Sequence, residues 1–222
     1  MMRPPFQPFM RRVRTASAFS LIELLVVIAI VAILLTASVG LFSNSANQAR
    51  QASRDIIKAH LQQARAHAIA TGNATALAIP VLGTSEDLGG KAISLFEVEK
   101  TGVFYSPITD NDGRQRMLQR WETLPGGFHF LPASLTTSGA PTIVDSPAML
   151  EASHQGSNIN CHVIVFAPNG QIVVPTTAIH IAIARANSRG GTLVPIEKSG
   201  GKPVYDLLQV NRLTARTRTI QP

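Results

Sequence analysis

RTASAFSLIELLVVIAIVAILLTASVGLF, residues 14–42, is the stretch that sets the N-terminal architecture of the chain. After Arg14 it carries one charged side chain, Glu23, near the start of a run that is almost entirely leucine, isoleucine, valine and alanine. No charge occurs from Leu24 to Phe42, which is close to the roughly 20 residues that a membrane-spanning helix needs. A carboxylate in hydrocarbon is costly without a partner, so Glu23 indicates a functional role.

The junction before this run resembles the N-terminal signal of prepilins and pseudopilins. In that family a basic leader precedes a phenylalanine, and the fifth residue of the mature chain is glutamate. The resemblance implies that a prepilin peptidase cleaves between Ala18 and Phe19 and N-methylates Phe19. It also implies that Glu23, the fifth mature residue, guides assembly. The chain departs from the family at Ala18, where glycine is usual.

The leader sets the charge and the expected topology of the chain. Four arginines and no acidic residue precede Phe19, so removing the leader lowers the formal charge from +7 to +3. Basic residues beside a span favour the cytoplasmic side. We therefore expect a single-pass protein of the bacterial inner membrane, with a cytoplasmic N-terminus and a periplasmic head. A plain anchor would explain the apolar run and the arginines, but not the position of Glu23.

The helix is predicted to continue beyond the membrane span, which covers about residues 21–42. From Met10 to Thr71 the chain has no proline and a single glycine. Gly72-Asn73 is a helix stop signal, so residues 19–72 are predicted to form one long helix with an amphipathic second half. The apolar face of that half has helical spacing and consists of Ile57, Leu61, Ala64 and Ala68.

Beyond residue 73, prolines recur and the sequence favours short strands separated by turns. Ile179, Ile181 and Ile183 alternate with His180, Ala182 and Ala184, which is the pattern of a half-buried strand. Asn169-Gly170 predicts a hairpin turn. Residues 135–160, rich in serine, threonine, alanine and proline, are predicted to form a long loop. The other strands are predicted at residues 76–79, 93–99, 118–122, 128–130, 163–166, 171–174, 204–210 and 214–220.

Several pieces of this region resemble the GspH/FimT group of minor pseudopilins and minor pilins, in the same order along the chain. The resemblance implies an α+β, type IV pilin-like fold, in which the long N-terminal helix packs on a head of two β-sheets. It divides the chain into a leader (1–18), the helix (19–72) and a periplasmic head (73–222). The matching pieces are LQQARAHAIATGNATALAI (61–79), WETLP (121–125), VFAPNG (165–170) and LTARTR (213–218), the last with Ala215 where glycine is usual.

Little in the sequence indicates catalysis. No P-loop, zinc-protease, paired-cysteine or nucleophile-elbow motif is present, so we expect neither an enzyme nor a cofactor or metal. The histidines are scattered, and packing or solvation explains them. Cys161 is the one cysteine and is predicted to be a buried core residue. Asp110-Asn111-Asp112-Gly113 is similar to part of a calcium loop, but a turn explains the same residues.

From Lys198 onward the chain has five basic residues and a single acidic one, Asp206. One interpretation is a solvated strand edge, where positive charge discourages edge pairing. The alternative is a strip that binds the DNA backbone through Arg212, Arg216 and Arg218, as the closing motif of FimT-type minor pilins implies. We favour the first interpretation, because the mature charge is only +3 and no aromatic residue interleaves these arginines.

Together with the family resemblance, the sequence predicts a minor pseudopilin of a type II secretion system, of the GspH kind. Such a subunit enters a periplasmic pseudopilus that helps to export folded proteins. Its expected partners are the prepilin peptidase, other pseudopilins in the filament and the inner membrane. The alternative is a minor pilin of a type IV pilus that acts as a DNA receptor. A solitary membrane-anchored β-domain would leave the N-terminal motif unexplained.

Overall fold

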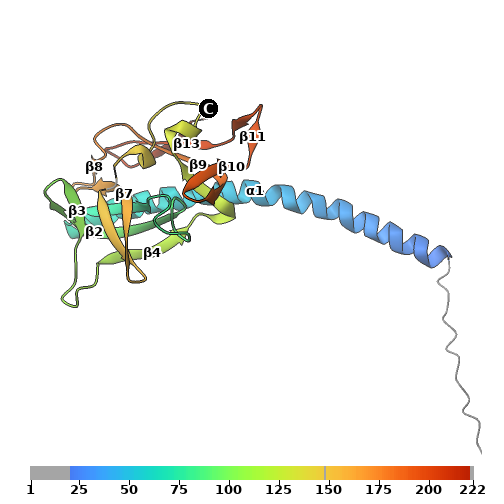
Figure 1. Cartoon of the computed structure of the whole chain (residues 1–222), viewed down its shortest axis with the longest axis horizontal. Helices are drawn as coiled ribbons and strands as arrows, with labels where there is room; N and C mark the ends of the chain where they lie inside the picture. The colour runs from blue at the N-terminus through green and yellow to red at the C-terminus, as the bar shows by residue number, and fades with distance from the viewer. Residues whose placement is uncertain (1–20, 148, 221–222) are drawn as a thin grey trace, which may run out of the picture. The chain divides into compact units, whose positions relative to one another are not determined.

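The computed structural model describes residues 21–147 and 149–220, and within its long helix the side chains of residues 34–44 are not described. The chain divides into two compact units, Met1–Asn44 and Ser45–Pro222. One α-helix, α1 (Leu21–Thr71), has residues in both units, and the described strands all lie in the second (Figure 1). The first two residues of the predicted helix, Phe19 and Ser20, lie outside the described residues.

The first unit, where it is described, is an apolar stretch of helix. Every side chain from Leu21 to Ile33 is exposed, and Glu23 is the only charged one among them. A helix that is apolar on all sides needs apolar surroundings, either lipid or other helices. Where side chains are described, no helix is both long and apolar enough to span a membrane. The predicted span, residues 21–42, extends over residues 34–42, outside that description.

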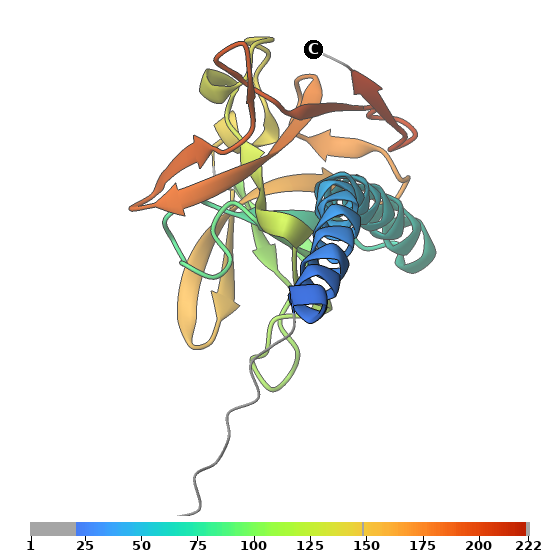
Figure 2. The ribbon, with the colours of Figure 1, turned by 90° about the vertical axis from the view of Figure 1, so that its right-hand side faces the viewer.

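The second half of α1 packs on the strands of the head, as the teal turns of the helix show in Figure 2. Ile57, Leu61, Ala64 and Ala68 are all fully buried, so the predicted apolar face is confirmed. Gly72 ends the helix with φ of +72°, and its N–H donates to the carbonyl of Ala68 at 3.1 Å. A left-handed residue after the last turn commonly terminates helices.

The head contains two main β-sheets and a two-stranded ribbon, and the predicted α+β architecture is confirmed. The first sheet consists of β1 (Thr75–Pro80), β2 (Ala92–Thr101), β3 (Phe104–Pro107), β4 (Met117–Thr123), β6 (Leu150–His154), β7 (Ser157–Phe166) and β8 (Ile172–Val174). The second consists of β5 (Phe128–Leu131), β9 (Ile179–Arg189), β10 (Thr192–Pro195), β13 (Asp206–Val210) and β14 (Thr217–Ile220). The ribbon is β11 (Lys198–Ser199) with β12 (Lys202–Pro203), and the 3-10 helices are η1 (Pro125–Gly127), η2 (Ala133–Leu135) and η3 (Ile143–Asp145).

The first sheet closes on itself. β1 pairs antiparallel with β2 on one side and with β7 on the other. β2 also pairs with β3, which meets β6 in a parallel contact between Tyr105 and Leu150, and β6 returns to β7. These strands form a ring, which β4 and β8 extend from β2 and β7. Closure leaves fewer unpaired strand edges than an open sheet would have.

β1 is buried along its whole length because both of its faces are covered. Leu77 and Ile79 belong to the main core, which also contains Leu61 of α1. Ala76 and Ala78 point the opposite way, since successive side chains of a strand alternate. They belong to a second core, formed mainly by residues of the ring strands. Small alanine side chains suit the narrow interior of a ring with few strands.

β9 is the centre of the second sheet and pairs antiparallel with β5, β10 and β13. Ile179, Ile181 and Ile183 face the main core. The prediction that this strand is only half-buried is wrong, because Ala182 and Ala184 are also buried. They lie in a third core, whose larger buried side chains are Leu131, Leu193, Tyr205 and Leu207.

The segment predicted as a long loop, residues 135–160, contains regular structure. It includes η3, β6 and the start of β7, and the two strands pair from Leu150 opposite Cys161 to His154 opposite Ser157. These strands begin or end in serine, asparagine and histidine, which have little intrinsic preference for a strand. Hydrogen bonds between β6 and β7 stabilise the strands despite this weak intrinsic preference. The sequence also does not predict β3 or β10.

Candidate functional site

The predicted cleavage residues, Ala18 and Phe19, lie outside the described residues. Glu23 lies in the first turn of α1 as described, and its side chain is exposed. The aligned peptide dipoles of a helix favour a carboxylate near this end. The exposed side chain is accessible to a group on a neighbouring molecule.

The predicted basic residues lie around the closing loop, residues 211–216, which joins β13 to β14. Asn211 shapes this loop, because its side-chain oxygen accepts hydrogen bonds from the N–H groups of Leu213 at 3.0 Å and Thr214 at 3.1 Å. The N–H of Asn211 donates to the carbonyl of Arg216 at 2.9 Å. This turn explains why β14 begins at Thr217 and not at the predicted residue 214.

Ala215 has a left-handed backbone, with φ of +54°, at the position where the GspH/FimT group usually has glycine. That conformation costs a residue with a Cβ roughly 1–2 kcal/mol. Burial offsets the cost, because Ala215 is fully buried in the main core. Its carbonyl also accepts a hydrogen bond from Nε2 of Gln62 at 3.0 Å. Alanine is therefore compatible with a turn that usually uses glycine.

The side chain of Arg212 donates hydrogen bonds to backbone carbonyls of the head. Its Nη1 donates to the carbonyl of Thr176 at 2.7 Å, and its Nη2 donates to the carbonyl of Ile172 at 3.1 Å. Its own carbonyl accepts the N–H of Ile172 at 2.8 Å. These bonds tie the closing loop to β8, so two nitrogens of the half-buried Arg212 guanidinium are bonded to the head itself.

Arg216 and Arg218 are exposed and belong to a shared surface. Both line a groove with a volume of about 620 Å³. The structure thus brings two of the predicted arginines together at the surface and separates Arg212 from them. The other lining residues, none of them acidic, are Gln209, Val210, Asn211, Thr214 and Thr217.

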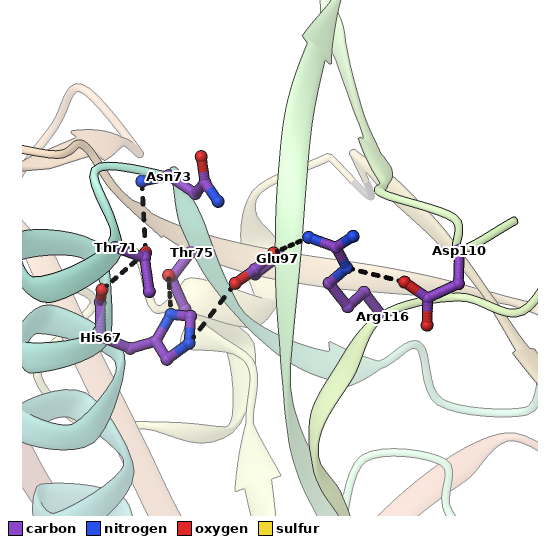
Figure 3. Close-up of polar contacts among 7 residues, drawn as sticks. All are labelled: His67, Thr71, Asn73, Thr75, Glu97, Asp110 and Arg116. Carbon is purple, nitrogen blue, oxygen red and sulfur yellow. Dashed lines mark hydrogen bonds and ion pairs between the residues drawn. The ribbon is translucent and has the colours of Figure 1, made fainter.

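A second polar cluster, which the sequence does not predict, surrounds Glu97 of β2 (Figure 3). Glu97 is buried, and its carboxylate lies 2.9 Å from Nη1 of Arg116 and 3.4 Å from Nε2 of His67. Nε of Arg116 contacts Asp110 at 2.9 Å. Hydrogen bonds to Glu97 and Asp110 raise the pKa of Arg116 above its ordinary value. The cluster joins the end of α1 to the hairpin between β3 and β4.

The hairpin at Asp110 is a turn, as predicted. The N–H of Gly113 donates to the carbonyl of Asp110 at 2.8 Å, and the N–H of Asp110 donates to the carbonyl of Arg114 at 2.8 Å. Arg116 supplies the positive charge beside the carboxylates of this cluster. Within residues 21–147 and 149–220, no group of three histidine, cysteine or carboxylate side chains is placed to hold a metal ion.

An ion cluster holds α1 against the second sheet. Nη2 of Arg50 lies 2.7 Å from Glu197, and Oδ2 of Asp206 lies 3.8 Å from Nε of Arg50 and 3.9 Å from Nε of Arg54. Burial raises the pKa of Asp206, and the two arginines oppose that shift. These pairs add a polar contact between helix and sheet to the apolar one in the main core.

Cys161 and His60 are two further buried titratable residues of the head. Cys161 is fully buried, as predicted, and burial raises the pKa of its thiol to about 12. His60 is also buried, with Nδ1 donating to the carbonyl of Ile56 at 2.8 Å and Nε2 lying 3.4 Å from Glu122. The raised pKa does not prepare the Cys161 thiol as a nucleophile, because a thiol becomes reactive only when its pKa is lowered.

The stability of the head is expected to fall as the pH decreases through about 6.5. Burial lowers the pKa values of His129 and His162 below the ordinary value of 6.5. The unfolded chain then binds more protons than the folded one, so the stabilisation is complete above that pH and is lost below it. Urea unfolding at pH 7.5 and 5.5 measures the change. His162→Asn retains a donor toward the carbonyl of Ser146, 2.7 Å from Nδ1, and should reduce the dependence. An unchanged slope would contradict the assignment.

The N-terminal stretch matches a known family model. Residues 13–39 correspond to the prokaryotic N-terminal methylation motif. The chain has a prepilin-type N-terminus. The matched residues of this prepilin-type segment include Ala18, Phe19 and Glu23.

One solved structure is similar to this chain at low identity. It is the type IV minor pilin FimU of Pseudomonas aeruginosa, with 16% identity and a TM-score of 0.39. The similarity covers 79% of this chain and 90% of FimU. No curated protein sequence matches the chain.

Proposed function

We propose that this protein is a minor pilin or pseudopilin, a structural subunit of a filament and not an enzyme. The observation that carries the proposal is the methylation motif at residues 13–39, with Glu23 at the fifth position counted from Phe19. A head with a long helix packed on two sheets supports it. On this proposal, residues 1–18 are the leader, 19–72 the long helix and 73–222 the periplasmic head.

Assembly would follow from the chemistry of the processed N-terminus. Cleavage before Phe19 creates a new α-amine, and the carboxylate of Glu23 in one subunit can pair with that amine in its neighbour. The pair offsets the cost of placing a charge in hydrocarbon and sets the stagger between adjacent helices. The apolar side chains of residues 21–33 are exposed on all sides. Lipid of the inner membrane would cover them before assembly, and neighbouring helices afterwards.

The head would move with the second half of its helix. Leu61 and its buried neighbours share a core with both sheets, and Arg50 adds ion pairs to Glu197 and Asp206. Displacing the helix therefore displaces the head, as a filament that extends through the periplasm requires.

We further propose that the filament is the pseudopilus of a type II secretion system and that the protein is of the GspH kind. Because Arg212 is engaged internally, the closing loop offers fewer cations than a strip that neutralises several phosphates would need. The alternative is a DNA-receiving minor pilin of a type IV pilus, supported by the groove beside Arg216 and Arg218. Deleting the gene separates the two, because the first predicts loss of protein secretion and the second loss of DNA uptake.

Mass spectrometry of the membrane-purified protein is expected to find a mature chain that begins at N-methylated Phe19. The methylation motif and the basic leader motivate this result. Ala18→Gly, which restores the residue usual in the family, should be cleaved at least as completely as the wild type. A chain that begins at Met1, or one cut after Ala37 or Ser38, would contradict the proposed function.

A further inference from the structure

Three segments meet at the C-terminal end of α1: its last turns, β8 with the loop before it, and the closing loop. Nε of Arg65 donates to the carbonyl of Gly170 at 3.1 Å. Ile69 packs against Gly170 so closely that a Cβ added to the glycine would lie 2.6 Å from Cδ1 of Ile69. Arg212 joins the closing loop to β8 through Ile172. The three segments therefore form one continuous surface.

This surface exposes apolar side chains beside arginines. Ile69 is 51% exposed, Val173 37% and Leu213 61%. With the exposed Arg216 and Arg218, we call them the basic apolar face. The hydrogen bonds of the closing loop already fix the backbone at Leu213, so a partner that contacts it has little backbone entropy to remove. Exposed apolar side chains on adjoining segments commonly mark an interaction site.

The positive charge of the face indicates the chemistry of the partner that would bind it. Residues 61–75, 166–181 and 207–222, which form and surround it, contain no aspartate or glutamate. The charges that these segments themselves carry are therefore all positive. A complementary partner presents carboxylates around an apolar side chain.

We propose that the basic apolar face binds another subunit with a prepilin-type N-terminus, through a segment that places an apolar side chain between carboxylates. The proposal rests on the proposed function and adds to it the surface and the chemistry of the partner. Leu213 and Ile69 supply the buried centre of the contact, where most binding energy resides. Arg216 and Arg218 orient the partner and speed its association.

Duplex DNA fits this face less well than a protein segment does. Arg65 and Arg212 both donate to backbone carbonyls of the head, whereas binding to DNA draws on several free cations. The centre of the face is aliphatic, which has no counterpart in a phosphate backbone. Stacking on bases would need exposed aromatic side chains, and the face as defined contains none.

Binding measurements on the full-length chain in detergent test the proposal. The probes are each of the other chains with a prepilin-type N-terminus from the same genome, and a short DNA duplex. Leu213→Ser is expected to weaken binding of at least one such chain by about tenfold or more. Arg216→Gln with Arg218→Gln should cause a similar loss and reduce the salt dependence. Thermal unfolding of each variant should match the wild type, because the replaced side chains are exposed.

Matched controls come from the hairpin between β2 and β3 and from the neighbouring turn. Phe104→Ser removes an apolar side chain that is 60% exposed, and Lys100→Gln with Arg114→Gln removes two exposed cations. Both controls should bind as the wild type does.

The proposal would be overturned if no prepilin-type chain binds, or if Leu213→Ser leaves that binding unchanged. It would also be overturned if the DNA duplex binds and only the Arg216→Gln, Arg218→Gln variant loses that binding. Self-association without a second chain would also overturn it. The proposed function is tested independently, because mass spectrometry measures processing at Phe19 and that processing does not depend on this face.

Discussion

Replacing Leu61 with alanine is expected to lower the free energy of unfolding of the head by about 3 kcal/mol. Leu61 is fully buried in the core that α1 shares with both sheets. The truncation removes apolar contacts and leaves a cavity, which strands paired on both sides cannot readily close. Urea unfolding of the second compact unit, Ser45–Pro222, followed by circular dichroism, measures the loss.

Gln63→Ala is the matched control for this prediction. Gln63 lies two residues further along the same helix, but its side chain is exposed. Its replacement should change the free energy of unfolding by no more than about 0.5 kcal/mol. If Leu61→Ala cost less than about 1 kcal/mol, the helix and the sheets would not share a tightly packed core.

Glu23→Leu is expected to reduce incorporation of the protein into filaments at least about tenfold while leaving membrane insertion intact. The substitution removes a polar group from an apolar helix, so insertion becomes no less favourable. It also removes the carboxylate that we propose to pair with the amine of Phe19 in a neighbouring subunit. Fractionation of sheared filaments, compared with the membrane fraction by immunoblotting, separates the two effects.

Glu86→Leu provides the control, because it removes an exposed carboxylate from the head and leaves the helix unchanged. It should support assembly like the wild type. Full incorporation and normal secretion by Glu23→Leu would show that the carboxylate of Glu23 has no part in assembly. Failure of both variants to reach the membrane would point instead to a defect in expression or insertion.

The long helix and its buried face could be predicted because their signals are local. Ile57, Leu61, Ala64 and Ala68 recur with the period of a helix, and a chain with that spacing must bury one face. The stop at Gly72 is also local, since glycine tolerates a left-handed backbone. Alternation of the isoleucines in β9 is another short-range signal, and it correctly placed one face of that strand in the core.

The errors in the predicted head have two causes. β6 and the start of β7 lie in a segment rich in polar residues, and they are strands because each supplies the hydrogen-bonding partner of the other. Ala182 and Ala184 are buried by side chains from β5, β10 and β13, among them Leu131 and Leu207. The partners of the two alanines lie far along the chain, so no window of neighbouring residues contains that information. β6 and β7 are close in sequence, and their polar residues give only a weak strand signal.

The same distinction applies to the candidate site. The sequence alone identified the prepilin-type motif around Phe19 and Glu23, because a peptidase recognises a linear segment. It also placed Arg212, Arg216 and Arg218 near one another, because they are close along the chain. Their separate environments are properties of the tertiary structure.

Only the folded head decides that Arg212 bonds to the carbonyls of Thr176 and Ile172, 36 and 40 residues away. The fold likewise brings Gln62 to Ala215 across 153 residues, and Arg116 to the buried Glu97. Local periodicity and covalent motifs are encoded in short stretches of sequence. Which polar groups find partners depends on how the helix and the two sheets pack, because the partners of a buried donor or acceptor come from whatever segments lie beside it.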